Sequence, residues 1–155
     1  MIGLSQTTGY AMQALGCLQN PSCECQSIAH IAECASVPRP YLAKIINALV
    51  RANLVRAKRG VGGGISLARP PAQISLLQIV EAVEGQRWLG ECLLGMADCT
   101  GTGICPTGAF WTRVRKEIIG ELNRATLADV IALRTRPRRG RSRHSTPQTE
   151  CCHEC

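Results

Sequence analysis

Apolar residues recur at helical spacing through the first fifty positions of the chain. Two short stretches, about Thr7–Leu18 and Gln26–Cys34, place an apolar side chain every three or four positions. A third stretch begins at Pro38 and continues to about Ala52, with apolar residues at i, i+3, i+4, i+7 and i+8. This spacing is typical of an amphipathic helix. The pattern therefore predicts three helices, the last two joined by a short turn.

The polar side of the third predicted helix carries Arg39, Tyr41 and Lys44 near its N-terminal end. Two helices joined by a turn of three or four residues form a helix-turn-helix, in which the start of the second helix meets base edges in the major groove. We therefore expect these three side chains to contact double-stranded DNA. Any other three-helix core would show the same periodicity, so that alternative stays open at this point.

Two short alternating runs lie between Leu54 and Arg69, on either side of a Gly-rich tip at residues 60–64. They predict a β-hairpin with Val55 and Ala57 on the same side of its first strand. A nucleotide-binding loop is the other reading of the glycines, but the run lacks the Gly-Lys-Ser/Thr ending of a P-loop. Glycines would instead let a narrow tip approach a DNA backbone, and Arg59 lies at that tip.

The second half of the chain predicts a helix from Ser75 to about Glu84, a long helix over about Gly108–Arg124, and a short last helix. The last helix is expected to begin at a capping box, Thr126-x-x-Asp129. The long helix carries an apolar stripe made of Trp111, Val114, Ile118 and Leu122, with Phe110 and Ile119 beside it. That stripe suits a partner helix from a second subunit, with packing inside one chain as the alternative.

Together these elements predict a mainly α fold with a small β wing. We expect a winged helix-turn-helix DNA-binding head at residues 1–72. Residues 73–133 then hold a linker helix, a cysteine loop and a long dimerisation helix. The remainder, residues 134–155, is rich in Arg, Pro and Cys and is expected to be disordered.

Charge sharpens the expectation of a DNA-binding head. The 155-residue chain has a net charge of +7, and no acidic residue occurs between Glu33 and Glu81. The basic residues of that interval are Arg39, Lys44, Arg51, Arg56, Lys58, Arg59 and Arg69. Such a stretch can neutralise phosphates, although a solvated basic face is the alternative. Aromatic residues make up only 3%, which argues against stacking platforms for single strands.

Three of the ten cysteines, Cys92, Cys99 and Cys105, lie in a stretch rich in Gly. The N-terminus lacks the charged and apolar regions of a signal peptide, and no run approaches the roughly 18 apolar residues of a membrane span. We therefore expect a cytoplasmic protein, in which clustered cysteines more often bind metal or take part in redox chemistry than form structural disulfides. Soft thiolates suit an iron–sulfur cluster or zinc.

The order of these parts resembles the Rrf-type winged-helix regulators of bacteria, which include the iron–sulfur regulator IscR and the nitric-oxide sensor NsrR. The resemblance covers roughly Leu4 to Leu133. It rests on Gly9-Tyr10-Ala11, Tyr41-Leu42, Leu54-Val55, the Arg59-to-Gly64 tip, the Ile79-to-Gly85 segment, the three cysteines and Trp111.

The resemblance implies a homodimeric transcription regulator, commonly a repressor. Its affinity for a promoter operator would follow the state of an iron–sulfur cluster that senses redox state, nitric oxide or iron–sulfur status. By the same resemblance the cluster ligands match Cys92, Cys99 and Cys105, the recognition helix matches Pro38 to about Leu49, and the wing arginine matches Arg59.

Two positions depart from the family. Some members take a fourth ligand from a histidine where this chain has Gly108, and others from an acidic residue where it has Gly9. The fourth ligand therefore stays open between Cys34, His30, Glu33 and a solvent or small-molecule ligand. The choice between a [2Fe–2S] and a [4Fe–4S] cluster also stays open.

A different functional class is an iron–sulfur or zinc-binding carrier or electron-transfer protein, which DNA binding would distinguish from a regulator. We expect no enzyme, because no Ser-His-Asp or paired-carboxylate constellation is evident. Outside the triplet, Cys17 is expected to be a small buried apolar residue. The cysteines of the last five residues, Cys151–Cys155, are metal-prone in composition but have no predicted fold around them.

Overall fold

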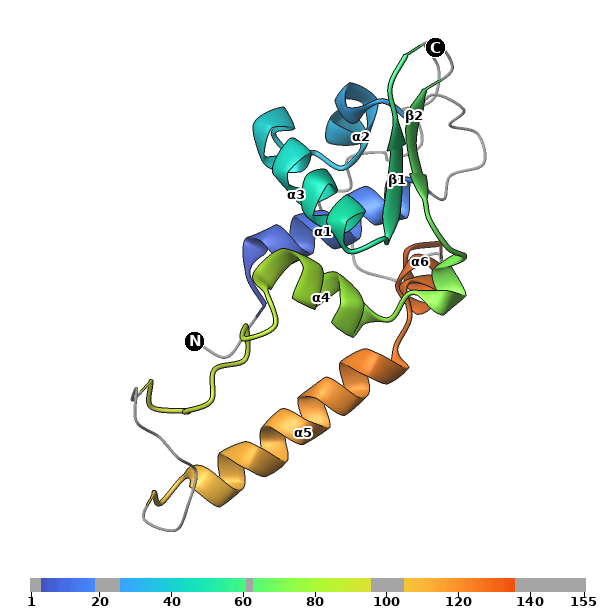
Figure 1. Cartoon of the computed structure of the whole chain (residues 1–155). Helices are drawn as coiled ribbons and strands as arrows, with labels where there is room; N and C mark the ends of the chain where they lie inside the picture. The colour runs from blue at the N-terminus through green and yellow to red at the C-terminus, as the bar shows by residue number, and fades with distance from the viewer. Residues whose placement is uncertain (1–3, 19–25, 61–62, 96–104, 136–155) are drawn as a thin grey trace, which may run out of the picture.

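The computed structural model describes residues 4–18, 26–60, 63–95 and 105–135 (Figure 1). In these ranges the chain forms six α-helices, one 3-10 helix and one two-stranded antiparallel sheet. The elements are α1 (Gln6–Cys17), α2 (Ile28–Cys34), α3 (Arg39–Arg51), β1 (Val55–Lys58), β2 (Gly64–Leu67), η1 (Pro71–Gln73), α4 (Leu76–Glu84), α5 (Gly108–Arg124) and α6 (Leu127–Thr135). The expected mainly α fold with a small wing is confirmed.

The head is built around the apolar side of α3. Its predicted stripe residues Leu42, Ile45, Ile46 and Leu49 are all buried. They pack against α1 and α2, which contribute Leu15 and Ile31 to the same core. The turn between α2 and α3 passes through Ser36 at a positive φ of 52°. The exposed side of α3 is thereby fixed relative to the other two helices.

The wing is an antiparallel hairpin in which Val55 pairs with Leu67 and Lys58 with Gly64. Val55 is buried in the head, whereas Ala57 is exposed although it lies on the same side of β1. On β2 the partner of Ala57 is Ile65, which is buried in the same core, so the hairpin packs on the head through Val55 and Ile65 (Figure 1).

Helix ends in the second half are fixed by side-chain caps. Ser75 and Gln78 form a capping box at the start of α4. The predicted box before α6 is confirmed, because Asp129 Oδ2 accepts from the Thr126 backbone N–H at 2.8 Å and the Thr126 hydroxyl accepts from the Asp129 N–H at 3.4 Å. Each box satisfies backbone donors that the first turn of a helix leaves open.

The core continues past the wing. Ile74, Ile79 and Leu127 are fully buried in the same cluster as the α3 stripe. The Leu127 N–H donates to the Ile74 carbonyl at 2.8 Å, so α6 returns to the head after α5. The expected boundary between the head and the second part of the chain at residue 72 remains a prediction.

The long helix α5 extends away from the head and packs against α4 (Figure 1). Trp111 is buried, Val114, Ile118 and Leu122 are half-buried, and Phe110 is 51% exposed. Among the described residues, no helix is both long and apolar enough to span a bilayer. The predicted tail from residue 136 onward, and Cys99, lie outside the described ranges.

Candidate DNA-binding surface and cysteine segment

The start of α3 presents the three side chains that the sequence predicted for DNA contact. Arg39, Tyr41 and Lys44 are exposed, and Tyr41 is 54% accessible. Leu42 lies between them in sequence and is fully buried. The apolar residues of α3 are committed to the core, so these polar residues occupy the remaining, solvent-facing part of the helix surface.

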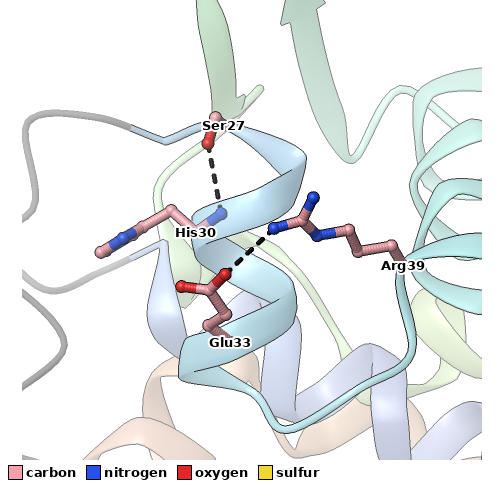
Figure 2. A network of polar contacts seen from close by, with 4 residues as sticks. All are labelled: Ser27, His30, Glu33 and Arg39. Carbon is pink, nitrogen blue, oxygen red and sulfur yellow. Dashed lines mark hydrogen bonds and ion pairs between the residues drawn. The ribbon is translucent and has the colours of Figure 1, made fainter.

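Arg39 is already engaged in an ion pair. Its Nη2 lies 3.0 Å from Glu33 Oε1 on α2, and both side chains are more than half exposed (Figure 2). Ser27 caps the other end of α2 by accepting from the His30 N–H at 3.2 Å. The pair links the two helices of the helix-turn-helix, and a phosphate or base edge would have to compete with Glu33 for this guanidinium.

Tyr41 is supported from α1. The rings of Tyr10 and Tyr41 meet edge to face, with centroids 6.4 Å apart and planes at 74°. Gln6 Nε2 donates to the Tyr10 hydroxyl at 2.8 Å and so holds that ring in turn. An edge-to-face pair restricts both rings. Tyr10 thus holds the Tyr41 ring at the start of α3.

The wing tip is a tight turn just beyond Arg59, whose side chain is exposed. Gly60 has φ of +96°, and the Gly63 N–H donates to the Gly60 carbonyl at 2.8 Å. A Cβ at Gly63 would lie 2.3 Å from the Lys58 carbonyl oxygen. The glycines therefore close the tip where a side chain would not fit.

The cysteine segment, residues 85–107, follows the C-terminal end of α4 and leads into α5. Cys92 and Cys105 are both half-buried thiols. The Cys92 carbonyl accepts from the Gly95 N–H at 3.2 Å, and the Cys105 carbonyl accepts from the Gly108 N–H at 3.1 Å. Each described cysteine therefore lies at a turn, one on each side of the stretch that contains Cys99.

Two contacts tie the cysteine segment to α5. The Trp111 Nε1–H donates to the Gly90 carbonyl at 3.0 Å, and the indole is only 5% exposed. Cys105 Sγ lies 3.3 Å from the Thr107 hydroxyl at the start of the helix. These contacts bring the beginning and the end of the segment to one end of α5.

The C-terminal end of α4, where the cysteine segment begins, is tied to α1 through Glu84. Its Oε1 accepts from the Ser5 N–H at 3.2 Å and from the Thr8 hydroxyl at 2.5 Å, and also from the Ser5 hydroxyl. Partial burial on its own would raise the pKa of Glu84, but the hydrogen bonds from Ser5 and Thr8 outweigh it and hold the pKa below its ordinary 4.5. The carboxylate therefore acts as a cap at the N-terminus of α1.

Comparison with known proteins decides the family. Residues 4–133 match the model of the Rrf2 family, described as an iron-dependent transcriptional regulator. The chain belongs to the Rrf2 family. It is a transcription regulator with a DNA-binding fold and not an enzyme, as the sequence led us to expect.

Individual relatives agree with that assignment. A Neisseria meningitidis protein named for the HTH-type transcriptional regulators is 34% identical over 104 residues, which cover 67% of this chain and 70% of the relative. The structure of IscR from T. potens superposes with a TM-score of 0.68 at 29% identity and covers 90% of this chain and 94% of its own. The structure of CymR, the global cysteine regulator of B. subtilis, superposes with a TM-score of 0.66 at 22% identity. The match covers 86% of this chain and 98% of CymR, and it supports the fold alone.

The fourth ligand of this Rrf2 protein stays open between the residues of α2 and an external ligand. Helix α2 and the part of the cysteine segment that directly follows α4 lie on different sides of the molecule (Figure 1). Of the three candidates on α2, Glu33 pairs with Arg39 and Cys34 lies against Cys17. Within the described ranges, which include two of the three predicted cysteines, no group of three metal-ligating side chains is assembled.

Three functional contacts of this Rrf2 chain were not predicted from its sequence. They are the Glu33–Arg39 pair, the support of Tyr41 by Tyr10 and the Glu84 cap on α1. Each joins residues from different elements. The only available signal was the Gly9-Tyr10-Ala11 motif, which marked Tyr10 without assigning it a partner.

Proposed function

We propose that this Rrf2 protein is a cytoplasmic homodimeric regulator, acting as a repressor, whose operator affinity is controlled by an iron–sulfur cluster. Cys92, Cys99 and Cys105 would hold the cluster. The observation that carries the proposal is the position of the cysteine segment. It joins α4, which packs in the head, to α5, which extends away from it (Figure 1).

The DNA side of the proposal rests on the exposed basic residues of the head. Arg39, Tyr41 and Lys44 would meet the major groove from the start of α3, and Arg59 would meet a phosphate from the wing tip. The absence of any acidic residue between Glu33 and Glu81 keeps this surface positive. We expect affinity to fall steeply with salt, because each phosphate neutralised adds about 0.9 to the slope of log K against log salt.

The donor chemistry of the segment fits a cluster. Cys92 and Cys105 are half-buried and lie at turns, and the Thr107 hydroxyl lies 3.3 Å from the Cys105 sulfur. Thiolate ligands with hydrogen bonds to sulfur and partial shielding from water are the features that set the potential of such clusters. When bound, the cluster would supply sensitivity to oxidants, nitric oxide and iron availability.

Coupling to DNA would run through the chain on both sides of the segment. Ligation would fix residues 92–105 against α5, where Trp111 already holds the Gly90 carbonyl. On the other side, Glu84 ties the end of α4 to the start of α1. A fixed segment would therefore fix the direction of α5 relative to the head. In a dimer this sets the spacing of two recognition helices, which half-sites about 34–36 Å apart require.

The dimer itself is proposed from α5. Val114, Ile118 and Leu122 are only half-buried in one protomer, and Ile119 beside them is 36% exposed. We expect Ile119→Glu to turn the dimer into a monomer in sedimentation equilibrium. The matched control is Lys116→Glu, because Lys116 is an exposed residue of the same helix. If Ile119→Glu remained fully dimeric, α5 would not be the interface.

The deciding experiment is anaerobic purification with iron and sulfide analysis, followed by operator binding with and without the cluster. We expect coloured, iron-containing protein whose operator affinity changes at least about tenfold when the cluster is removed.

Cys92→Ala should lose iron and sulfide. Cys17→Ala, a thiol of the head, is the matched control and should retain both. Metal-free protein that binds its operator undiminished would overturn the cluster, and binding in no state would overturn the regulator. Zinc in place of iron would overturn the iron–sulfur assignment but would keep the three cysteines as a metal-binding site.

Nothing in the described structure or among the relatives supports the alternative of a carrier or electron-transfer protein.

A further inference from the structure

Two cysteines outside the cysteine segment meet inside the head. Cys17 is the last residue of α1 and Cys34 the last residue of α2, and their sulfur atoms lie 2.6 Å apart. Even carbon atoms, which are smaller than sulfur, sit about 3.5–4.0 Å apart in non-bonded contact. Both side chains are half-buried rather than enclosed, so water and small solutes can reach the pair.

The sequence gives no reason to pair these two residues. The sequence predicts Cys17 to be a small buried apolar side chain and leaves Cys34 as one of several candidates for the fourth cluster ligand. The packing of α1 against α2 brings their C-terminal ends together. The juxtaposition is therefore a product of the tertiary fold and not of a local motif.

We propose that Cys17 and Cys34 are a reversible thiol–disulfide pair, a second redox site of this protein that is separate from the cysteine segment. Closing the bond would shorten the sulfur separation from 2.6 Å to about 2.05 Å. The remaining change in sulfur separation is small. The pair lies at the ends of α1 and α2, whereas the cysteine segment joins α4 to α5 (Figure 1). The inference does not depend on the proposed cluster.

The chemistry requires an oxidant, and hydrogen peroxide is the one we name. One thiolate attacks a peroxide oxygen, the O–O bond breaks, and the sulfur becomes a sulfenic acid while the other oxygen leaves as water. The second thiolate then attacks the sulfenic sulfur, the S–S bond forms and the hydroxyl leaves as a second water. In sum two thiols lose two protons and two electrons, and the peroxide takes up both. A low-molecular-weight thiol reverses the reaction by exchange through a mixed disulfide.

The cross-link would join α1 to the helix that precedes the recognition helix. Helix α2 leads through Ala35, Ser36 and Val37 directly into α3. A bond between the ends of α1 and α2 limits the ways in which the head can open and constrains its unfolded chain. The oxidised head should therefore melt at a higher temperature than the reduced head, with the fold of the DNA-binding surface preserved.

The test treats full-length protein with a small excess of hydrogen peroxide and maps the cross-links by mass spectrometry. Trypsin is unsuitable, because the first basic residue of the chain is Arg39 and both cysteines would remain in one peptide. Cleavage after Leu18 and Glu24 separates Cys17 from Cys23 and Cys25, and cleavage after Glu33 separates these from Cys34. We expect a peptide pair that joins Cys17 to Cys34 and disappears on addition of dithiothreitol.

Thermal unfolding supplies the second readout. Oxidation should raise the melting temperature by about 5 °C or more in the natural protein. In Cys17→Ser and Cys34→Ser the difference between oxidised and reduced samples should vanish, even if the substitution lowers both values. Cys155→Ser, which removes a thiol outside both proposed sites, is the matched control and should keep the full difference. If no Cys17–Cys34 peptide forms, or if the shift persists in Cys17→Ser, the proposal is overturned.

Discussion

The carboxylate of Glu84 accepts a hydrogen bond from the hydroxyl of Thr8 at 2.5 Å, so the last residue of α4 caps the first turn of α1. Sequence positions 76 residues apart are joined at this point. The contact lies one residue before Gly85, whose φ of +88° starts the cysteine segment. It therefore ties the helix that precedes the cysteine segment directly to the first helix of the head.

We expect Glu84→Gln to lower the free energy of unfolding at pH 7 by about 0.5–1.5 kcal/mol, a value kept small because the carboxylate is partly exposed. The pKa of Glu84 is lower in the folded protein than its ordinary 4.5. The stabilisation is thus present above about pH 4.5 and is lost as the pH falls through the lower folded value. Urea unfolding at pH 7 and at pH 3 should show a gap between the two proteins that closes at the lower pH.

The control for that experiment is Glu121→Gln, which removes an exposed carboxylate that pairs with Arg124 on α5 at 2.9 Å. A surface pair of this kind is worth about 0.2–1 kcal/mol at most, so the change at pH 7 should be smaller. Equal losses in the two variants, or a gap for Glu84→Gln that does not depend on pH, would contradict the capping role.

Removing the partner of Arg39 should strengthen DNA binding. In Glu33→Gln the guanidinium no longer has to exchange an ion pair for a phosphate or base, and we expect operator affinity to rise about two- to fivefold at low salt. Fluorescence anisotropy with a labelled operator duplex measures the effect. Glu117→Gln removes the same charge from an exposed position on α5 and should change affinity less. A loss of affinity in Glu33→Gln would mean that the pair positions Arg39 rather than competing for it.

The wing tip offers a matched pair of glycines. A Cβ at Gly63 would lie 2.3 Å from the Lys58 carbonyl oxygen, whereas a Cβ at Gly64 would meet Gln26 atoms only at 3.6–3.8 Å. We expect Gly63→Ala to reduce operator affinity about tenfold, comparable to the loss of one good contact, while the melting temperature changes little. Gly64→Ala should bind as the natural protein does. Equal binding by both variants would show that the tip does not touch DNA.

Trp111 should determine how firmly the cysteine segment is held. Trp111→Phe keeps most of the buried ring but removes the donor to the Gly90 carbonyl, and we expect a loss of about 1 kcal/mol of stability. Limited proteolysis should then cut the cysteine segment faster. Phe110→Leu, a change at the exposed neighbouring aromatic, is the control and should leave the proteolysis rate unchanged. If Trp111→Phe is cleaved at the same rate as the natural protein, the hydrogen bond from Trp111 to Gly90 does not restrain the cysteine segment.

Periodicity alone predicted most of the elements, since the burial of an amphipathic stripe is a local property of spacing. The α3 stripe is buried as expected, the capping box at Thr126 and Asp129 is formed, and the hairpin pairs across its glycine tip. The cysteine ligands could be predicted only as residue types in a suitable stretch. Cys99 lies outside the described residues, and the assignment of all three remains a prediction.

The sequence by itself determined which residues face inward, where the helices begin and end, and where charge and thiols are concentrated, because these follow from spacing and composition along the chain. Tertiary structure alone decided which distant residues meet. Glu84 reaches Thr8, Tyr10 supports Tyr41, and Cys34 lies against Cys17 rather than beside the cysteine segment. Such contacts depend on how helices pack in three dimensions, and a one-dimensional pattern of apolar positions does not encode which side chains at the ends of two packed helices will touch.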